Sequence, residues 1–186
     1  EVIMDEADKM NKLVKKLLTL NQLESGQDAV CMERFNLTEL LNGVVNNAAI
    51  LLKQKEAIVT YPTEPIYVWA DEFKVEEVLT NYLSNAIHHA EGEKRIDISC
   101  VQKGDKVRVS VFNTGNPIPE EDVDNIWIKF YKVDKARTRE YGGSGIGLSI
   151  VRAIMDSFHQ KCGVINHEDG VEFWFELETN NGNFFS

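Results

Sequence analysis

Apolar side chains recur at alternating steps of four and three along the first 24 residues, which is the spacing of one face of an α-helix. The face comprises Ile3, Ala7, Met10, Val14 and Leu17, and it is widened by Leu13, Leu18, Leu20 and Leu23. Ser25-Gly26 then supplies a helix stop. The pattern predicts a helix that packs against a helical partner, with packing on its own domain as the alternative.

From residue 35 onward, helical and strand patterns follow one another. Helices are expected from about Thr38 to Lys55, from an Asp71 cap to about Ala90, and from about Gly145 to Phe158. Pro119 suits the first position of one further short helix. Alternating runs predict strands at residues 57–61, 66–70, 95–101, 106–113, 162–167 and 171–178, and the last four strands form two hairpins.

Strands that come in pairs between helices favour the α+β class, because simple alternation of strand and helix is absent. We expect a two-layer α/β sandwich with a mixed sheet of about five strands and three main helices, preceded by one long helix. The chain divides into a helical segment at residues 1–26, a globular domain at residues 35–178 and a loose tail at residues 179–186. The first helix begins without a cap, so the chain is expected to be a piece of a longer protein.

Composition narrows the range of partners. The 186 residues carry a formal net charge of −10, which argues against nucleic acid or an anionic membrane surface as the main partner. No run approaches the ~20 apolar residues that cross a bilayer. The three cysteines lack metal spacing and indicate a reduced environment. One basic cluster opposes the overall charge, formed by Lys129, Lys132, Lys135, Arg137 and Arg139.

Asn81, Asn85 and His88 share one stripe of the helix expected after Asp71. Amide oxygens are hard neutral ligands, suited to a Mg²⁺ ion that keeps several waters and takes its other ligands from nucleotide phosphates. A pair of exposed asparagines is the alternative. Zinc is a poorer choice, because His88 and His89 point about 100° apart on a helix and no cysteine accompanies them.

A glycine-rich run, Gly142-Gly143-Ser144-Gly145-Ile146-Gly147-Leu148, stands directly before the last helix. Backbone N–H groups and the positive end of a helix can face an anion there, and a di- or triphosphate suits the place. The glycine spacing is not that of a Rossmann fingerprint, and no Gly-Lys-Ser/Thr follows as in a Walker loop. A flexible linker or a helix cap is the alternative.

The strand that ends at Asn113 runs into Thr114-Gly115, and Ile118 follows between two prolines. A polar side chain in this position can hydrogen-bond a planar base, while Gly115 lets the base approach closely. A simple turn is the alternative.

Together these elements resemble the GHKL ATP-binding fold that histidine kinases share with gyrase B. Residues 81–86 resemble the kinase N box, residues 113–115 the G1 box, residues 127–132 the F box and residues 143–148 the G2 box. The first helix resembles the second dimerisation helix of the same kinases, the C-terminal part of a phospho-acceptor hairpin. Residues 130–139 resemble kinases of Gram-positive bacteria, including those of vancomycin resistance.

The resemblance implies a role for each part of the site. Asn85 would ligate Mg²⁺ with support from Asn81, while His88 and Lys132 would approach the phosphates, and these four are the catalytic candidates. His89 would lie near the adenine or ribose, and residues 131–143 would form a mobile lid. The implied nucleotide contacts are Asn85, His88, His89, Asn113, Gly115, Ile118, Tyr131, Lys132, Arg137, Gly143, Ser144, Gly145, Ile146, Gly147 and Leu148.

Two departures from the family pattern matter. The G1 position usually holds Asp, which accepts a hydrogen from the adenine amino group. Asn113 can still accept, but its NH₂ could also tolerate other bases. No histidine of this chain stands in the sequence context of a phospho-acceptor, so the acceptor is expected upstream.

The implied function is transfer of the ATP γ-phosphate to that histidine within a homodimer, followed by relay to an aspartate of a response regulator. In the ATPases of the superfamily a Glu at the position of Asn81 activates water, and an amide cannot take that proton. A nucleotide-binding regulatory module without kinase activity and a GHKL-type ATPase are the alternatives. The resemblance also implies a cytoplasmic domain of a membrane-anchored protein, with ATP and Mg²⁺ as ligands.

Overall fold

Alternating apolar residues form the strands of one mixed sheet in the computed structural model, which describes residues 2–133 and 145–180. The strands in these residues are β1 (Glu33–Asn36), β2 (Ile58–Thr60), β3 (Tyr67–Ala70), β4 (Arg95–Lys103), β5 (Lys106–Thr114), β6 (Cys162–His167) and β7 (Gly170–Glu178). Their order is β1-β3-β7-β5-β4-β2, and β6 also pairs with β7. β2 runs parallel to β4, and the other pairs are antiparallel.

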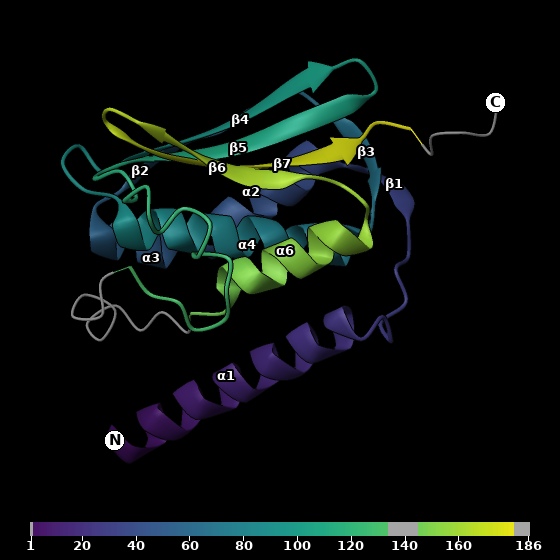
Figure 1. The fold of residues 1–186 in the computed structure, drawn as a ribbon. Helices are drawn as coiled ribbons and strands as arrows, with labels where there is room; N and C mark the ends of the chain where they lie inside the picture. The colour runs from purple at the N-terminus through teal and green to yellow at the C-terminus, as the bar shows by residue number, and fades with distance from the viewer. Residues whose placement is uncertain (1, 134–144, 181–186) are drawn as a thin grey trace.

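Helices cover one face of this sheet (Figure 1). The layer consists of α2 (Leu37–Asn47), α3 (Ala49–Lys55), α4 (Glu72–His89) and α6 (Gly147–Ser157). The first helix, α1 (Val2–Glu24), lies on the far side of α6 from the sheet (Figure 1). The two-layer α+β sandwich expected from the sequence is confirmed.

The apolar core lies between the sheet and α4. Tyr82 has no exposed surface, and its hydroxyl donates to the backbone oxygen of Trp174 over 3.0 Å. Its ring tilts against Phe173 and Phe175, with centroids 5.4 and 5.9 Å away. Burial raises the pKa of Tyr82, so its hydroxyl remains a donor. This packing fixes the rotation of α4 and therefore decides which of its side chains face away from the core.

The end of α1 packs on the rest of the molecule. Leu20 and Leu23 are buried in the core and α1 contacts α6, whereas residues nearer the start of the helix, such as Met10, are exposed. Gly26 and Gln27 donate backbone hydrogen bonds to Leu23 and Gln22, which ends the helix where the Ser25-Gly26 signal predicts. No helix within residues 2–133 and 145–180 is both long and apolar enough to span a bilayer.

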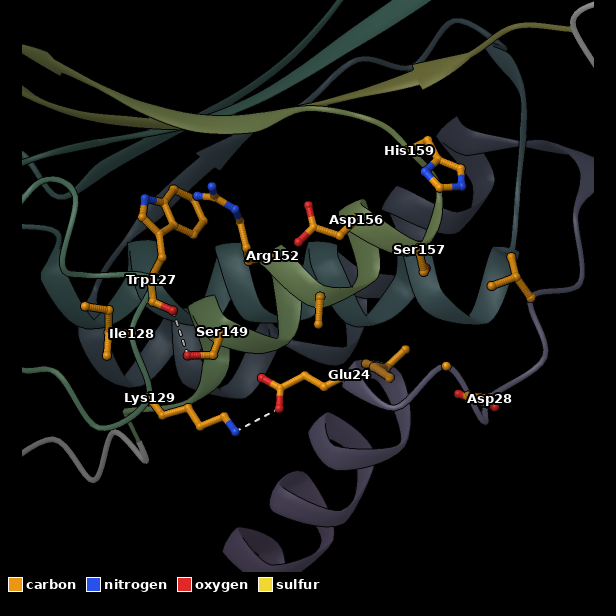
Figure 2. A pocket seen from close by; sticks show the side chains of 14 residues that line it. Glu24, Asp28, Trp127, Ile128, Lys129, Ser149, Arg152, Asp156, Ser157 and His159 are labelled. Carbon is orange, nitrogen blue, oxygen red and sulfur yellow. Dashed lines mark hydrogen bonds and ion pairs between the residues drawn. The ribbon is translucent and has the colours of Figure 1, made fainter.

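Two ion pairs join α1 and its connector to the sandwich. Glu24 pairs with Lys129 at 2.9 Å (Figure 2), and Asp28 pairs with the largely buried Lys74 at 2.6 Å. The backbone N–H of Cys31 donates to the carboxylate of Asp71, the residue that caps α4. The connector is therefore fastened to the start of α4.

Three local features differ from expectation. The sheet has seven strands in the described residues rather than about five: all six predicted strand segments join it, and so does β1, whose four residues show no clear alternation. The helix expected at residues 38–55 is broken at Ala48, whose ψ is 1°. The short helix expected at Pro119 is wrong. Amides of Asp122 and Asn125 bond to carbonyls three residues earlier, so this segment is a series of turns.

Candidate functional site

The polar stripe of α4 lies at the edge of the core. Asn81, Asn85 and His88 are half-buried, and His89 is exposed. The Nδ2 of Asn81 donates to the backbone oxygen of Glu77 over 2.9 Å. The donor end of this amide therefore faces its own helix, and Oδ1 is left as the acceptor end.

The start of α6 lies against that oxygen. A Cβ placed on Gly147 would come within 2.9 Å of the Oδ1 of Asn81, so this approach requires glycine. The residue before it, Ile146, is fully buried, and its side chain makes no capping hydrogen bond to α6. The first N–H groups of a helix have no partners within the helix. Oδ1 of Asn81 therefore lies next to the N-terminal, positive end of α6.

The turn that carries Lys132 packs beside the same end of α6. The N–H of Phe130 donates to the backbone oxygen of Gly145 over 2.7 Å. The hydroxyl of Ser149 donates to the backbone oxygen of Trp127 over 2.9 Å (Figure 2). A Cβ on Gly145 would lie 3.5 Å from the Cε of Lys132. The Lys132 side chain therefore leaves its turn next to the start of α6, where a cation and a helix terminus can share one anion.

The end of β5 meets the end of α4. Asn113 is only 2% exposed, and its Nδ2 donates to the backbone oxygen of Thr114 over 3.1 Å. Because a carbonyl oxygen can only accept, this bond fixes the orientation of the amide. Gly115 has a φ of 148°, and a Cβ there would lie 2.8 Å from the backbone oxygen of His89. The expected base-binding turn is therefore in contact with the end of α4, the helix that carries the expected magnesium ligands.

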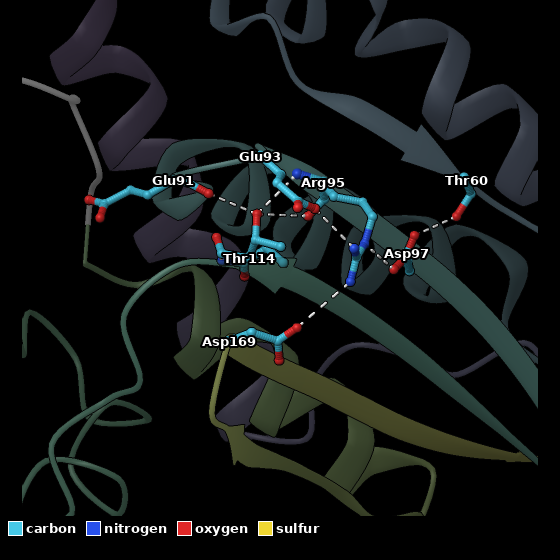
Figure 3. Close-up of polar contacts among 8 residues, drawn as sticks. Thr60, Glu91, Glu93, Arg95, Asp97, Thr114 and Asp169 are labelled. Carbon is cyan, nitrogen blue, oxygen red and sulfur yellow. Dashed lines mark hydrogen bonds and ion pairs between the residues drawn. The ribbon is translucent and has the colours of Figure 1, made fainter.

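Thr114 fastens this end of β5 to the turn that follows α4 (Figure 3). Its hydroxyl donates to the backbone oxygen of Glu91 over 2.8 Å and accepts from the N–H of Arg95 over 3.0 Å. The guanidinium of Arg95 is in turn bonded to Asp97 at 2.8 Å. These contacts join the end of β5, which carries Asn113, to the turn after α4.

Ile118 is held by the edge of the sheet. Its N–H donates to the Oδ1 of Asn166 over 2.9 Å, and the Nδ2 of Asn166 donates to its carbonyl over 2.7 Å. This two-bond contact ties the loop after β5 to β6.

His88 lies among positive charges. Burial lowers the pKa of His88, and Lys55, His89 and Lys16 lower it further. Its imidazole is therefore neutral near pH 7. An anion bound beside it would favour the protonated form.

The donor set suits a magnesium ion that is shared with a ligand. Among the described residues, no three His, Cys, Asp or Glu side chains gather into a metal-binding group. Oδ1 of Asn81, an amide oxygen, lies at the start of α6. Mg²⁺ bound by few protein groups keeps water and phosphate oxygens as its other ligands, which agrees with this set.

Two surface cavities are found on the part of the chain that the structure describes. One of about 810 Å³ lies between the end of α1 and α6, lined in part by Leu23, Trp127 and Arg152 (Figure 2). The other, of about 410 Å³, lies beside Thr114 and Asp169 (Figure 3). Gly115, one of the expected nucleotide contacts, lines the second cavity. Arg137, Gly143 and Ser144 lie outside the described residues, as does most of the expected lid.

Comparison with known proteins agrees with this geometry. Residues 70–181 match the family model described as histidine kinase-, DNA gyrase B- and HSP90-like ATPase. The catalytic domain of histidine kinase ThkA matches with a TM-score of 0.70 and 34% identity, over 80% of this chain and 96% of that domain. The chain belongs to the histidine kinase-, DNA gyrase B- and HSP90-like ATPase family, and within it to the ATP-binding catalytic domains of histidine kinases.

Two further relatives are longer than this chain. The sensor protein kinase WalK of Staphylococcus saprophyticus is 31% identical over 158 residues, which are 84% of this chain and 26% of that protein. Histidine kinase ThkA, solved in complex with the response regulator protein TrrA, matches with a TM-score of 0.76 and 30% identity, over 96% of this chain and 50% of that chain. The chain thus spans about a quarter of the length of the curated sensor kinase.

Sequence reasoning missed Asp122. Its carboxylate accepts a hydrogen bond from the hydroxyl of Tyr131, one of the expected nucleotide contacts. The short helix expected at Pro119 predicts no contact between Asp122 and Tyr131. The spacing of nine residues follows no helix or strand period, so no pattern could have revealed the contact.

Proposed function

We propose that this chain binds Mg·ATP and transfers the γ-phosphoryl group to a histidine on a dimerisation helix outside the chain. The observation that carries the proposal is the contact between Gly147 and Asn81. It brings an amide oxygen, which suits a magnesium ion, to the helix end that suits phosphates. Membership of the histidine kinase family supports the same reading.

In this proposal each group has one task. Asn85 ligates the magnesium ion and Asn81 supports it, while Lys132 and His88 contact the phosphates beside the start of α6. The bound ion would neutralise phosphate charge during transfer. Asn81 and Asn85 are amides and cannot take a proton from water, so rate enhancement rests on positioning and charge neutralisation rather than on hydrolysis.

The remaining expected contacts line the same place. His89, Gly115 and Ile118 would border the base or ribose, and Tyr131 would lie at the root of the lid. Gly145, Ile146, Gly147 and Leu148 would present backbone groups to the phosphates. Arg137, Gly143 and Ser144 complete the proposed set outside the described residues.

Asn113 would read the base as an acceptor. One of the two N–H donors of its amide already donates to Thr114, which fixes the orientation of the group. Oδ1 is then the end that can accept from the amino group of adenine. We therefore propose that ATP is preferred over GTP despite the replacement of the usual Asp.

The partners follow from the resemblance and from α1. The half of α1 that does not pack on the core exposes Ile3, Met10 and Val14. We propose that this face joins a homodimer through a dimerisation hairpin of which residues 1–26 are a part, next to a catalytic domain at residues 35–178 and a tail at residues 179–186. ThkA was solved with a response regulator, which supports relay to such a partner. By the same resemblance, the whole protein would be membrane-anchored with this part in the cytoplasm.

Phosphotransfer tests the proposal directly. The chain is incubated with Mg²⁺ and γ-labelled ATP or GTP, with and without the purified dimerisation hairpin of its own full-length protein. Label is expected on the hairpin histidine from ATP, and Asn85→Ala should reduce its transfer about 10- to 100-fold. Asn46→Ala removes an exposed amide from α2 and serves as the matched control.

Each outcome distinguishes one reading from another. Rapid release of free phosphate without label on the hairpin would identify a hydrolase. Tight binding of ATP with neither transfer nor release would identify a regulatory binding module. Equal transfer from ATP and GTP would overturn the proposed role of Asn113 and leave the kinase reading intact.

A further inference from the structure

Asp122 is the centre of the turns that connect the end of β5 to Lys132. Its N–H donates to the backbone oxygen of Pro119 over 2.9 Å, and its own carbonyl accepts from Asn125 at 2.9 Å and Ile126 at 3.0 Å. Its carboxylate accepts from the hydroxyl of Tyr131. Backbone and side chain of one half-buried residue therefore fasten the segment both before and after it.

The middle of this segment is anchored to the core. Ile126 is buried, and Trp127 packs edge-on against Phe173 with ring centroids 5.9 Å apart. The backbone oxygen of Trp127 also accepts from Ser149 of α6. These contacts hold residues 126 and 127 in place independently of the conformation of residues 130–132.

The end of the segment is under backbone strain. Phe130 has a φ of 63°, in the left-handed region that a bulky side chain rarely adopts. Such a conformation persists where surrounding contacts impose it. Two hydrogen bonds flank it: the N–H of Phe130 donates to the backbone oxygen of Gly145, and the Tyr131 hydroxyl donates to the carboxylate of Asp122. The bond to Asp122 raises the pKa of Tyr131, which keeps the hydroxyl protonated as the donor.

Lys132 follows directly after this strained turn. Its Cε lies 3.5 Å from the position a Cβ would have on Gly145, beside the start of α6. The direction in which Lys132 leaves the turn depends on the backbone at residues 130 and 131. A contact that fixes Tyr131 therefore also fixes the approach of the Lys132 ammonium to the start of α6.

We propose that Asp122 is a positioning residue of the nucleotide site, which acts through the Tyr131 hydroxyl to place Lys132 at the phosphates. The inference rests on the proposed binding of Mg·ATP and adds a residue that never touches the nucleotide. If the role of Asp122 were purely structural, its loss would weaken the binding of all nucleotides alike. If Asp122 positions Lys132 at the phosphates, the loss of affinity on replacing Asp122 grows with the number of phosphates on the ligand.

The test compares Mg·ATP with AMP as probes of the whole chain, by calorimetry or by displacement of a fluorescent nucleotide. Asp122→Ala is expected to raise the Kd for Mg·ATP about tenfold and that for AMP less than about twofold. Asp122→Asn keeps an oxygen that can accept from Tyr131 and should stay within about threefold of the parent. Asp124→Ala removes an exposed neighbouring carboxylate and should change neither Kd.

A second variant isolates the route through Tyr131. Tyr131→Phe removes the hydroxyl, and Asp122→Ala added to it should produce no further loss of Mg·ATP affinity. Equal losses for ATP and AMP, an unchanged Kd in Asp122→Ala, or a full further loss in the double variant would each overturn the positioning role. Failure of the parent chain to bind Mg·ATP would instead overturn the proposed function.

Discussion

Gly147 has no side chain, and this lets the start of α6 lie against the amide of Asn81 on α4. A Cβ added at Gly147 would stand 2.9 Å from Oδ1, so Gly147→Ala must displace Asn81 or the start of α6. The Kd for Mg·ATP is expected to rise about tenfold or more, measured by calorimetry. Gly43→Ala on α2 meets nothing within 4 Å and should leave the Kd unchanged. Parent-like affinity in Gly147→Ala would show that Asn81 takes no part in binding.

The depressed pKa of His88 gives nucleotide binding a pH dependence. Burial and the neighbouring Lys55, His89 and Lys16 lower the pKa of His88 below 6.5, and bound phosphates would raise it again. Binding should therefore take up a proton, and the affinity for Mg·ATP should increase as pH falls from about 7.5 to about 6. His88→Gln should lose this part of the increase, whereas His159→Gln, at the far end of α6, should retain it. Calorimetry in two buffers of different ionisation enthalpy measures the proton uptake, and equal uptake by the parent and His88→Gln would refute the assignment.

Local sequence signals predict candidate site residues one at a time, without the contacts between them. Glycine at position 147 and asparagine at position 81 were recognised because their motifs are short and ordered along the chain. The contact between them could not be foreseen, since it depends on how α6 packs on α4. The Asp122 contact with Tyr131 was missed for the same reason, because it arises from a series of turns without a period.

Long periodic elements were predicted well and short ones were not. α4 and the β4–β5 hairpin carry many residues on one buried face, so their apolar pattern is unambiguous. β1 has four residues and is held in place by β3, which gives its own sequence little influence. The break at Ala48 was missed because both halves of the helix share an apolar face towards the core.

The docking of α1 depends on very few side chains. Leu20 is 1% exposed, whereas Leu18 on the same helix is 57% exposed. Leu20→Ala should lower the free energy of unfolding by about 2–4 kcal/mol in urea titrations, because it leaves a cavity in the core. It should also accelerate hydrogen exchange of the α1 amides. Leu18→Ala is the matched control, with an expected change within about 0.5 kcal/mol. Equal effects of the two variants would mean that α1 does not dock in solution.

The sandwich as a whole should fold without α1. The ThkA catalytic domain covers 80% of this chain, and its helices and strands form a structure of their own. A variant that begins at Val30 loses Leu20, Leu23 and both connecting ion pairs. Its free energy of unfolding should fall by about 3 kcal/mol, while its Kd for Mg·ATP should stay within about threefold of the parent. An unfolded variant would show that α1 belongs to the same cooperative unit, which circular dichroism would detect.

The order of the strands sets a condition on how this protein is made. β7, at residues 170–178, pairs with β5 along its whole length and with β3 at Trp69–Glu178, and among the strands of the described residues it is synthesised last. Before it leaves the ribosome, β1–β3 and β5–β4–β2 are two separate pieces with one apolar face each and no strand between them. Non-local strand pairs of this kind form slowly. A nascent chain that stalls before residue 170 therefore exposes the apolar faces of both pieces of the sheet at once. Rapid translation of the end of the domain shortens this exposure and so limits aggregation.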